Sequence, residues 1–449
     1  MSTETPTRSA HLLEAWTVAG AVLVLRLPFL SPGFGLQPDG WRVALAARSM
    51  RATGRYVASR YGANPLHELL AVGLFDGLPL LLNLASALGA VALAEAVRRL
   101  VFHRGRGVRI AAALAAVGLP IVWIESVAGK DYLISTGLLA WALVFGLRGH
   151  PHRAGALLGL AAGFRLPMLI FAPALLVARP EPLGRMRLRD FTGLLTLGIT
   201  AALALSPSAT VHGMGILHSD DPAGYAPQRL LVSLPAAVGP LGLLGFTLAA
   251  SAWVVAKSSL RLATGPSTAS LAVLFLQGLL FVYNPGSSPS SYLVPTLPFA
   301  VVLVALQSSP ACWPALALMT LSGALFGVSG PQAKQSGFQT AQVRFHLPGG
   351  RGLYPFYGEI FQNHDLRRQQ QALIERVVRE VEELPPGTLL LAGPWKPKLE
   401  WSAPGLTVAY RINPEDVNGR TVYALPGASK WSPGVHARPL PHPDDLLER

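Results

Sequence analysis

Long apolar runs recur along the chain of 449 residues and are separated by short polar stretches. A helix needs roughly 20 apolar residues to cross the roughly 30 Å of hydrocarbon in a bilayer, because its backbone groups must all be paired internally. By this measure the pattern predicts membrane spans near residues 11–30, 76–97, 108–124, 132–147, 191–206, 230–256, 267–283, 292–308 and 314–329. The sequence is therefore typical of an all-α polytopic membrane protein.

Basic residues gather in the loops on one side of these spans. The clusters are Arg98 to Arg109, Arg148 with Arg153, Arg179 to Arg189, and Lys257 with Arg261. Cytoplasmic loops are enriched in Lys and Arg, so we expect all four clusters, and the N-terminus, on the cytoplasmic side of the cell membrane.

The apolar segment 154–178 lies between two of these clusters, so it must enter and leave on the same side. Gly163 and Pro167 flank Arg165, and proline removes a helical hydrogen bond. We therefore predict a hairpin of two short helices broken around Arg165. This brings the total to about 11 membrane segments and puts the C-terminus outside. An intramembrane arginine is costly unless it faces an anionic partner.

The last part of the chain, 331–449, changes character. Residues 365–384 have the period of an amphipathic helix, with Ile374, Val377, Val378 and Val381 on one face. Short strand-like runs follow at 388–392, 406–410 and 420–425. We predict a small extracytoplasmic α/β domain here, after a transmembrane domain spanning 1–330.

Composition agrees with a membrane protein and argues against nucleic acid as a partner. Hydrophobic residues make up 51% of the chain and charged residues 14%. The net charge is +13, but the stretch from Pro331 onward has 14 Lys and Arg against 12 Asp and Glu, so 23 of the 37 basic residues belong to the hydrophobic part. A single cysteine, Cys312, excludes an internal disulfide.

The predicted topology gathers polar residues in the outward loops. They are Asp39, Arg42, Arg48, Arg51, Arg55, Arg60, His67 and Glu68; Glu125, Lys130 and Asp131; His212, His218, Asp220, Asp221 and Tyr225; and Tyr283, Asn284 and Tyr292. Asp39 in Pro-Asp-Gly is either a turn residue or a catalytic carboxylate. Lys130 and Asp131 form either a surface ion pair or part of a site. His67 and Glu68 either cap a helix or reach that site.

Two further groups in these loops leave alternatives open. Arg48, Arg51 and Arg55 are spaced to share one helix face, which suits lipid phosphates or simple anchoring to membrane lipids. The group from His212 to Asp221 is compatible with a divalent metal, but its spacing matches no ligand motif, so a polar loop is the alternative. No metal ligands are assigned.

The order of several short motifs resembles the dolichyl-phosphate-mannose-protein mannosyltransferase-like glycosyltransferases, bacterial members of the GT-C superfamily. The first pieces are Arg26-Leu27-Pro28-Phe29-Leu30, Asp39, Ala46-Ala47-Arg48-Ser49-Met50, Gly54-Arg55-Tyr56 and Tyr61-Gly62-Ala63-Asn64-Pro65-Leu66. The later ones are the Gly-rich stretch from Ala154 to Arg165 and Ser291-Tyr292-Leu293-Val294-Pro295-Thr296-Leu297-Pro298.

The resemblance implies an inverting transferase that moves a sugar from a polyprenyl-phosphate donor to a glycan, lipid or protein acceptor at the extracytoplasmic face. The catalytic loop would be 31–68, with Asp39 as the general base. Arg165 and Lys130 would balance charge on the leaving phosphate. The substrate-binding residues expected at this face are Arg165, Lys130, Asp131, His67, Arg42, His218, Asp220 and Tyr292.

The chain departs from the family pattern at two positions. Gly40 stands where relatives often have a second acid, and Ser291 stands where they often have an arginine. The alternative function is a lipid-linked oligosaccharide transporter without transferase activity, and a non-catalytic membrane scaffold is a third. A carrier usually places ionisable groups near the bilayer midplane, whereas this chain concentrates them in loops.

Overall fold

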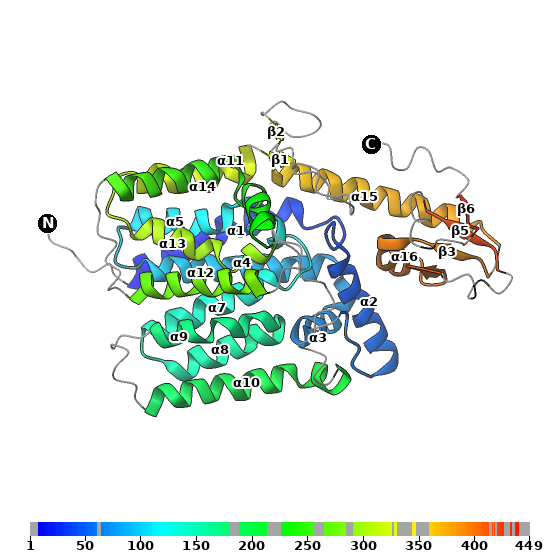
Figure 1. Cartoon of the computed structure of the whole chain (residues 1–449), viewed down its shortest axis with the longest axis horizontal. Coiled ribbons are helices and arrows are strands. Elements are labelled where there is room, and N and C mark those ends of the chain that lie inside the picture. The colour runs from blue at the N-terminus through cyan, green and yellow to red at the C-terminus, as the bar shows by residue number, and fades with distance from the viewer. Residues whose placement is uncertain are drawn as a thin grey trace.

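The computed structural model shows a bundle of helices with a smaller helix-and-strand unit at one end (Figure 1). It describes residues 8–60, 64–178, 188–212, 226–255, 265–283, 291–325, 327–329, 344–346, 359–385, 387–412, 415, 417, 420–425, 432 and 436–439. The bundle comprises α1 (Arg8–Arg26), α4 (Leu80–Leu100), α5 (Arg106–Gly118), α6 (Pro120–Ser126), α7 (Tyr132–Leu147), α8 (Pro151–Phe164), α9 (Ala172–Val177), α10 (Leu188–His212), α11 (Ala226–Val255), α12 (Gly265–Tyr283), α13 (Leu297–Leu306) and α14 (Cys312–Leu325).

Each predicted span contains a helix or a broken pair of helices, but the span near 314–329 is helical only to Leu325, and Gly327–Ser329 form a strand. Within the described residues, four stretches are long and apolar enough to cross a membrane unaided: His11–Phe29, Leu80–Leu100, Asp190–Val211 and Ala237–Val254. Shorter apolar helices are Tyr132–Leu147, Leu166–Val177, Gly265–Leu280, Leu297–Leu306 and Cys312–Leu325. The count of about 11 membrane segments and the side on which each loop lies stay predictions.

Two predicted continuous spans are broken, and proline explains both breaks. The span near 108–124 is α5 and α6, which meet at a bend of 72°. Leu119 is extended (φ −59°, ψ 138°) because Pro120 disfavours helical geometry at the preceding residue. The span near 230–256 is interrupted at Gly239 (φ 71°, ψ 167°), directly before Pro240.

The predicted break at Arg165 is confirmed. Helix α8 ends at Phe164, and Arg165 is extended, with φ −157° and ψ 103°. The 3-10 helix η3 (Leu166–Phe171) and the short α9 then follow. Pro167 at the start of η3 gives the local reason, because its ring excludes the continued α-helical ladder.

Close approach of α8 and α10 depends on three glycines spaced four residues apart. A side chain at Gly155 would collide with the carbonyl oxygen of Gly193, and a Cβ at Gly163 would lie 2.5 Å from the Cβ of Ala204. At Gly159 a Cβ would lie 2.7 Å from that of Thr200. Lipid is as apolar as a leucine side chain, so helices in a membrane associate through this kind of tight packing rather than through the hydrophobic effect.

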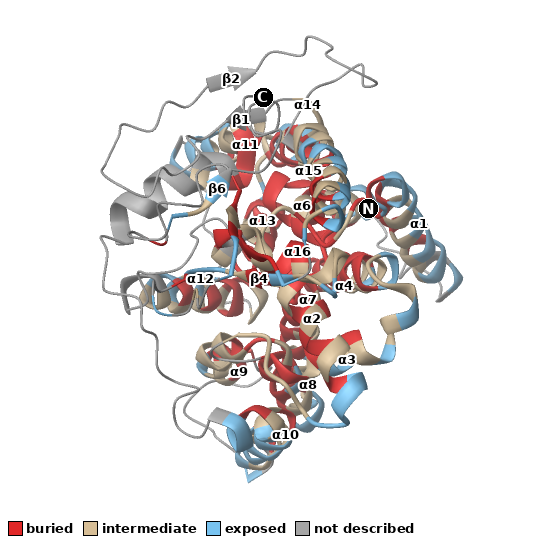
Figure 2. Ribbon diagram, turned by 90° about the vertical axis from the view of Figure 1, so that its right-hand side faces the viewer, coloured by how far each residue is buried: buried red, intermediate tan, exposed pale blue. Residues whose placement is uncertain are grey.

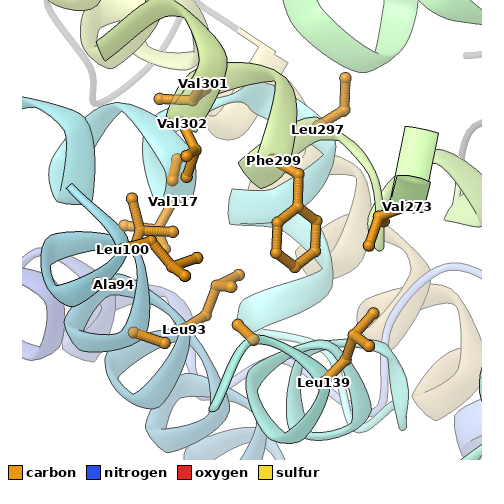
Figure 3. Close-up of a cluster of buried hydrophobic side chains, with 14 of the residues drawn as sticks. Leu93, Ala94, Leu100, Val117, Leu139, Val273, Leu297, Phe299, Val301 and Val302 are labelled. Carbon is orange, nitrogen blue, oxygen red and sulfur yellow. The ribbon is translucent and has the colours of Figure 1, made fainter. Parts of the chain in front are cut away.

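The main core runs through the bundle and joins helices that are distant in sequence. Phe299 of α13 is fully buried among side chains of other helices, including Leu93 of α4, Leu139 of α7 and Val273 of α12 (Figure 3). Many neighbours in this core are alanines, which lets the backbones approach.

At one end of the bundle lie α2 (Pro38–Thr53), α3 (Pro65–Gly73) and the C-terminal unit (Figure 1). In that unit α15 (Glu359–Glu382) precedes a parallel sheet of order β4-β3-β5-β6. Its strands are β3 (Leu389–Leu391), β4 (Thr407–Ala409), β5 (Val422–Ala424) and β6 (Arg438–Pro439). A two-stranded antiparallel pair, β1 (Gly327–Ser329) and β2 (Arg344–His346), lies outside this sheet.

The sequence patterns in the C-terminal unit predicted its elements well. Strands β3, β4 and β5 fall inside the three predicted runs, and Leu390 pairs with both Val408 and Tyr423. On α15 the predicted apolar face is buried, with Ile374 at 1% and Val377 at 3% exposed. The amphipathic helix begins before the predicted boundary, at Glu359.

The C-terminal unit is attached to the loop between α1 and α2. Arg367 of α15 is buried and donates hydrogen bonds to the carbonyl oxygens of Phe29 (3.1 Å), Pro32 (2.6 and 3.0 Å) and Gly33 (3.2 Å). The end-on view shows α2, α16 (Lys396–Ser402) and β4 together at this end of the molecule (Figure 2). The loop and the C-terminal unit therefore lie on the same side of the bundle.

Candidate functional site

Asp39 lies in the first turn of α2, not in an isolated turn. Pro38 occupies the first helical position, where its missing N–H costs nothing, and an acidic side chain next to it is favoured by the helix dipole. The carboxylate Oδ2 lies 2.8 Å from Arg60 Nη1, and Oδ1 lies 4.0 Å from Arg42 Nη1. The side chain is 28% exposed, so one oxygen is held by a cation while the group stays accessible.

The backbone beside Asp39 has no room for a second side chain. A Cβ placed on Gly40 would lie 2.7 Å from the carbonyl oxygen of Phe34 and 3.2 Å from that of Gly129. The packing around Gly40 thus leaves no space for a second acidic side chain directly after Asp39. Any residue larger than glycine would have to displace backbone atoms.

Arg60 links Asp39 to a second buried carboxylate. Its Nη2 lies 3.2 Å from Asp131 Oδ1, while Asp131 Oδ2 accepts a hydrogen bond from Arg165 Nη1 at 3.2 Å. Asp131 is 1% exposed and directly precedes α7. The four side chains form an alternating row of charges, Asp39, Arg60, Asp131 and Arg165.

Arg165 is enclosed by aromatic rings. Its guanidinium carbon lies 3.8 Å from the centre of the Tyr132 ring and 4.7 Å from that of Tyr292. Such contacts stabilise a cation that burial has stripped of water. The expected anionic partner of Arg165 is present within the protein, and it is Asp131.

Lys130 lies in a separate ion pair beside this row. Its Nζ donates to Glu125 Oε1 at 2.8 Å and to Gln37 Oε1 at 2.7 Å. Gln37 is the residue before α2, so Lys130 ties the second loop to the start of the helix that carries Asp39. Lys130 is buried, and the alternative of a surface ion pair with Asp131 is wrong.

His67 and Glu68 lie in the first turn of α3 and are both buried. Glu68 accepts hydrogen bonds from the Tyr56 hydroxyl and from the backbone N and Oγ of Ser59, at 2.8 and 2.5 Å. Neither ring nitrogen of His67 has a hydrogen-bond partner among the described residues. Glu68 therefore organises the loop 56–59, while a contact between His67 and substrate stays a prediction.

The row of arginines on α2 differs from the prediction. Helix α2 ends at Thr53, so Arg55 lies beyond it and the three side chains do not share a helical face. Arg48 donates to the carbonyl oxygens of Glu400 (2.9 Å) and Trp401 (2.6 Å) and stacks on the Trp401 ring. The proposed lipid-phosphate face is thus partly used for contact with the C-terminal unit.

Ionisation of the two carboxylates is set by their cationic neighbours. Burial by itself would raise the pKa of the Asp39 carboxyl, but the charges of Arg60 and Lys130 outweigh it and hold that pKa below its usual value. Burial also opposes ionisation of Asp131, yet Arg60 and Arg165 lower its pKa to about 2. Both groups are anionic at neutral pH.

Parts of the predicted site fall outside the described residues. These are His218, Asp220, Asp221, Tyr225 and Asn284, together with the side chains of His212 and Tyr283. In the part of the chain that is described, no three His, Cys, Asp or Glu side chains gather as metal ligands. A metal in the loop from His212 to Asp221 stays an untested hypothesis.

Of the predicted residues, the structure brings Asp39, Arg42, Lys130, Asp131, Arg165 and Tyr292 together at one end of the bundle. Sequence reasoning missed Arg60 as a site residue, although it belongs to the same outward loop. The sequence signal that could have identified Arg60 was the excess of basic residues in that loop. It did not distinguish Arg60 from Arg48 or Arg51, which have other partners.

Comparison with known proteins gives structural matches only. No protein-family model and no curated protein matches the sequence. ArnT from Cupriavidus metallidurans bound to undecaprenyl phosphate aligns with a TM-score of 0.55 and 14% identity, over 96% of this chain and 90% of that chain.

Two further structural matches have lower TM-scores. Apo ArnT from the same organism has a TM-score of 0.47 and 20% identity, and covers 66% of this chain, which spans 59% of that one. Arabinosyltransferase EmbB from Mycobacterium smegmatis has a TM-score of 0.39 and 18% identity, over 68% of this chain and 31% of that one. ArnT aligns over almost the whole length of this chain, so the chain shares the fold of that protein.

Proposed function

We propose that the protein is an integral-membrane glycosyltransferase that moves a sugar from a polyprenyl-phosphate donor to an acceptor, with inversion at the anomeric carbon. The observation that carries this proposal is the placement of Asp39. Its carboxylate is ionised, accessible and fixed by Arg60, at the end of the bundle where the buried cations Arg165 and Lys130 also lie. The similarly folded ArnT was solved with undecaprenyl phosphate, which supports a lipid-linked donor.

Asp39 acts as the general base in this reaction. As the acceptor hydroxyl oxygen bonds to the anomeric carbon, its proton passes to the Asp39 carboxylate. The bond between that carbon and the phosphate oxygen breaks, and the electron pair leaves with the polyprenyl phosphate. A carboxylate that is ionised at neutral pH suits this step because it is ready to accept a proton. One displacement inverts the configuration.

Arg165 and Lys130 balance the charge of the departing phosphate. A guanidinium has five N–H donors, and in the described part of the chain the Arg165 side chain donates one hydrogen bond, to Asp131. Its remaining donors suit phosphate oxygens, and charge-assisted hydrogen bonds of this kind are the strong ones. Asp131 holds Arg165 in place, and Tyr292 flanks it.

The remaining assignments follow from this arrangement. Arg42 and His67 contact substrate beside Asp39 and Asp131. A role of His218 and Asp220 in substrate binding is proposed from the sequence alone. The N-terminus is cytoplasmic, and the catalytic loop and the C-terminal domain lie on the extracytoplasmic face of the cell membrane. Their direct contact through Arg367 supports a shared side.

Replacement of Asp39 by asparagine tests the proposal. Asp39→Asn keeps the shape of the side chain but cannot accept the proton, so transfer from a panel of undecaprenyl-phosphate sugars is expected to fall at least about 10²-fold. Binding of undecaprenyl phosphate is expected to persist. Asp76→Asn is the matched control, because this acid is largely exposed and pairs with Arg51 away from the site. Near wild-type transfer by Asp39→Asn would sink the base assignment, and donor binding without transfer by the wild-type protein would favour the carrier.

A further inference from the structure

A cavity of about 400 Å³ opens between the first-loop region and the C-terminal unit. Its lining residues come from α2, from the loop that follows it, and from α16 and the end of β4. They are Arg42, Leu45, Ala46, Val57, Ala58, Ser59, Lys396, Pro397, Glu400 and Tyr410. Small-molecule sites have volumes of this order, about 300–1,000 Å³.

The two walls of the cavity are fixed to each other at its edge. Arg48 of α2 donates to the backbone oxygens of Glu400 and Trp401 and stacks on the Trp401 ring at 4.2 Å. Phe34 packs edge-on against the same ring, with centroids 5.3 Å apart. The cavity therefore depends on the contact between the C-terminal unit and α2.

Asp39 does not itself line the cavity, but two lining residues lie next to Asp39 or to its partner Arg60. Arg42, which lines the cavity, lies one helical turn after Asp39, with its Nη1 4.0 Å from Asp39 Oδ1. Ser59, which also lines the cavity, directly precedes Arg60, whose Nη1 holds Asp39 Oδ2 at 2.8 Å. A molecule in this cavity would thus contact side chains that neighbour the proposed base.

The chemistry of the lining favours an anionic, hydroxylated ligand. Arg42 and Lys396 contribute two cations. Lys396 pairs with Glu400 at 3.3 Å, but both side chains are about one-third exposed, and exposed pairs of this kind are weak. A ligand anion can therefore compete for Lys396. Leu45, Val57 and Pro397 add apolar surface on which a sugar ring can lie.

We propose that this cavity is the acceptor site, and that the acceptor is a sugar bearing a phosphate or carboxylate that faces Lys396 and Arg42. The assignment rests on the proposed transferase function. It adds a role for the C-terminal unit, because Lys396, Glu400 and Tyr410 make it part of the acceptor site and not only a cover. The acceptor hydroxyl then points to Asp39 while its anion lies at the rim.

Ligand binding to the full chain in phosphatidylcholine nanodiscs tests this site. Glucose 6-phosphate and glucuronate serve as anionic probes, glucose as the neutral one, and undecaprenyl phosphate reports the donor site. Lys396→Glu is expected to weaken binding of both anionic probes about tenfold or more and to leave undecaprenyl phosphate binding unchanged. Arg376→Glu is the control, because Arg376 also pairs with a glutamate at 3.3 Å and has similar exposure but does not line the cavity.

The outcomes of this binding experiment distinguish the proposed acceptor site from its alternatives. Tighter binding of the anionic probes than of glucose, lost in Lys396→Glu but not in Arg376→Glu, supports the acceptor site. No binding of the anionic probes by the wild-type chain, or equal binding by Lys396→Glu, overturns it. Displacement of glucose 6-phosphate by phosphatidylglycerol in the nanodisc assigns the cations to membrane lipid and also overturns it. Failure of the wild-type chain to bind undecaprenyl phosphate counts against the transferase instead.

Discussion

Arg60 holds Asp39 with one terminal nitrogen, at 2.8 Å, and Asp131 with the other, at 3.2 Å. That guanidinium thus positions the proposed base and makes the largest cationic contribution to its lowered pKa. It also joins that base to Asp131, which holds Arg165. The loop that presents Asp39 and the broken helix that presents Arg165 are connected through two side chains.

Arg60→Gln is expected to move the acid limb of the pH profile of kcat to higher pH. The Arg60 charge lowers the pKa of Asp39 against the opposing effect of burial, so its loss raises that pKa. Asp39 then takes up a proton at a higher pH, and protonated Asp39 cannot act as a base. Below the raised pKa, each unit of increase lowers the active fraction roughly tenfold. Arg55→Gln, an exposed arginine of the same loop, serves as the control. An unchanged acid limb in Arg60→Gln would contradict this account.

Gly40→Ala is expected to destabilise the protein by about 1–3 kcal/mol, the usual cost of overpacking. The new Cβ would lie 2.7 Å from the Phe34 carbonyl oxygen, so the loop or α2 must shift. Thermal unfolding in detergent, followed by tryptophan fluorescence, measures the change. Gly20→Ala in α1 is the control, because no atom lies within 4 Å of the added Cβ. A melting temperature for Gly40→Ala equal to that of the wild type would show that the loop can shift without a loss of stability.

Arg367→Lys is expected to lower stability by about 2 kcal/mol, the order of a hydrogen bond to a charged group, and also to lower turnover. A lysine keeps the charge but cannot reach the Phe29, Pro32 and Gly33 carbonyl oxygens with one planar fork. Greater mobility of this loop would also disturb the position of Asp39, which follows it in the chain, and so lower turnover. Thermal unfolding and transfer rate are measured together, with Arg368→Lys, its exposed neighbour, as the control. Wild-type values for both quantities would remove Arg367 from any positioning role.

Sequence patterns predicted those structural elements that depend on neighbouring residues in the chain. The break around Arg165 follows from Pro167, and the buried face of α15 follows from the spacing of Ile374, Val377 and Val381. Hydropathy located the apolar helices for the same reason. It could not show that α5 and α6 meet at 72°, because the angle depends on what packs around Pro120 as well as on the proline itself.

Which charged side chains pair with each other could not be predicted from the sequence. Asp39 was predicted as the central acid, but its partner Arg60 lies 21 positions away, after the end of α2, and nothing in the spacing selects it. Similarly, Arg48 meets Trp401 only because the C-terminal unit folds back onto α2. Such contacts depend on tertiary structure, while propensity and periodicity report on segments of about ten to twenty residues.

The last residue of α1 connects the roots of both loops. Arg26 is buried; its Nη2 donates to the Val117 carbonyl oxygen at 2.7 Å, its Nε donates to Ser126 Oγ at 2.6 Å, and it stacks on Trp123. The Arg26 side chain therefore supplies a hydrogen bond to a carbonyl oxygen at the bend between α5 and α6, where the regular helical hydrogen bonds are interrupted. Because the loop carrying Asp39 starts just after Arg26, and the loop carrying Lys130 and Asp131 starts just after Ser126, the two loops share one anchor. The same buried side chain therefore fixes the bases of both loops relative to each other.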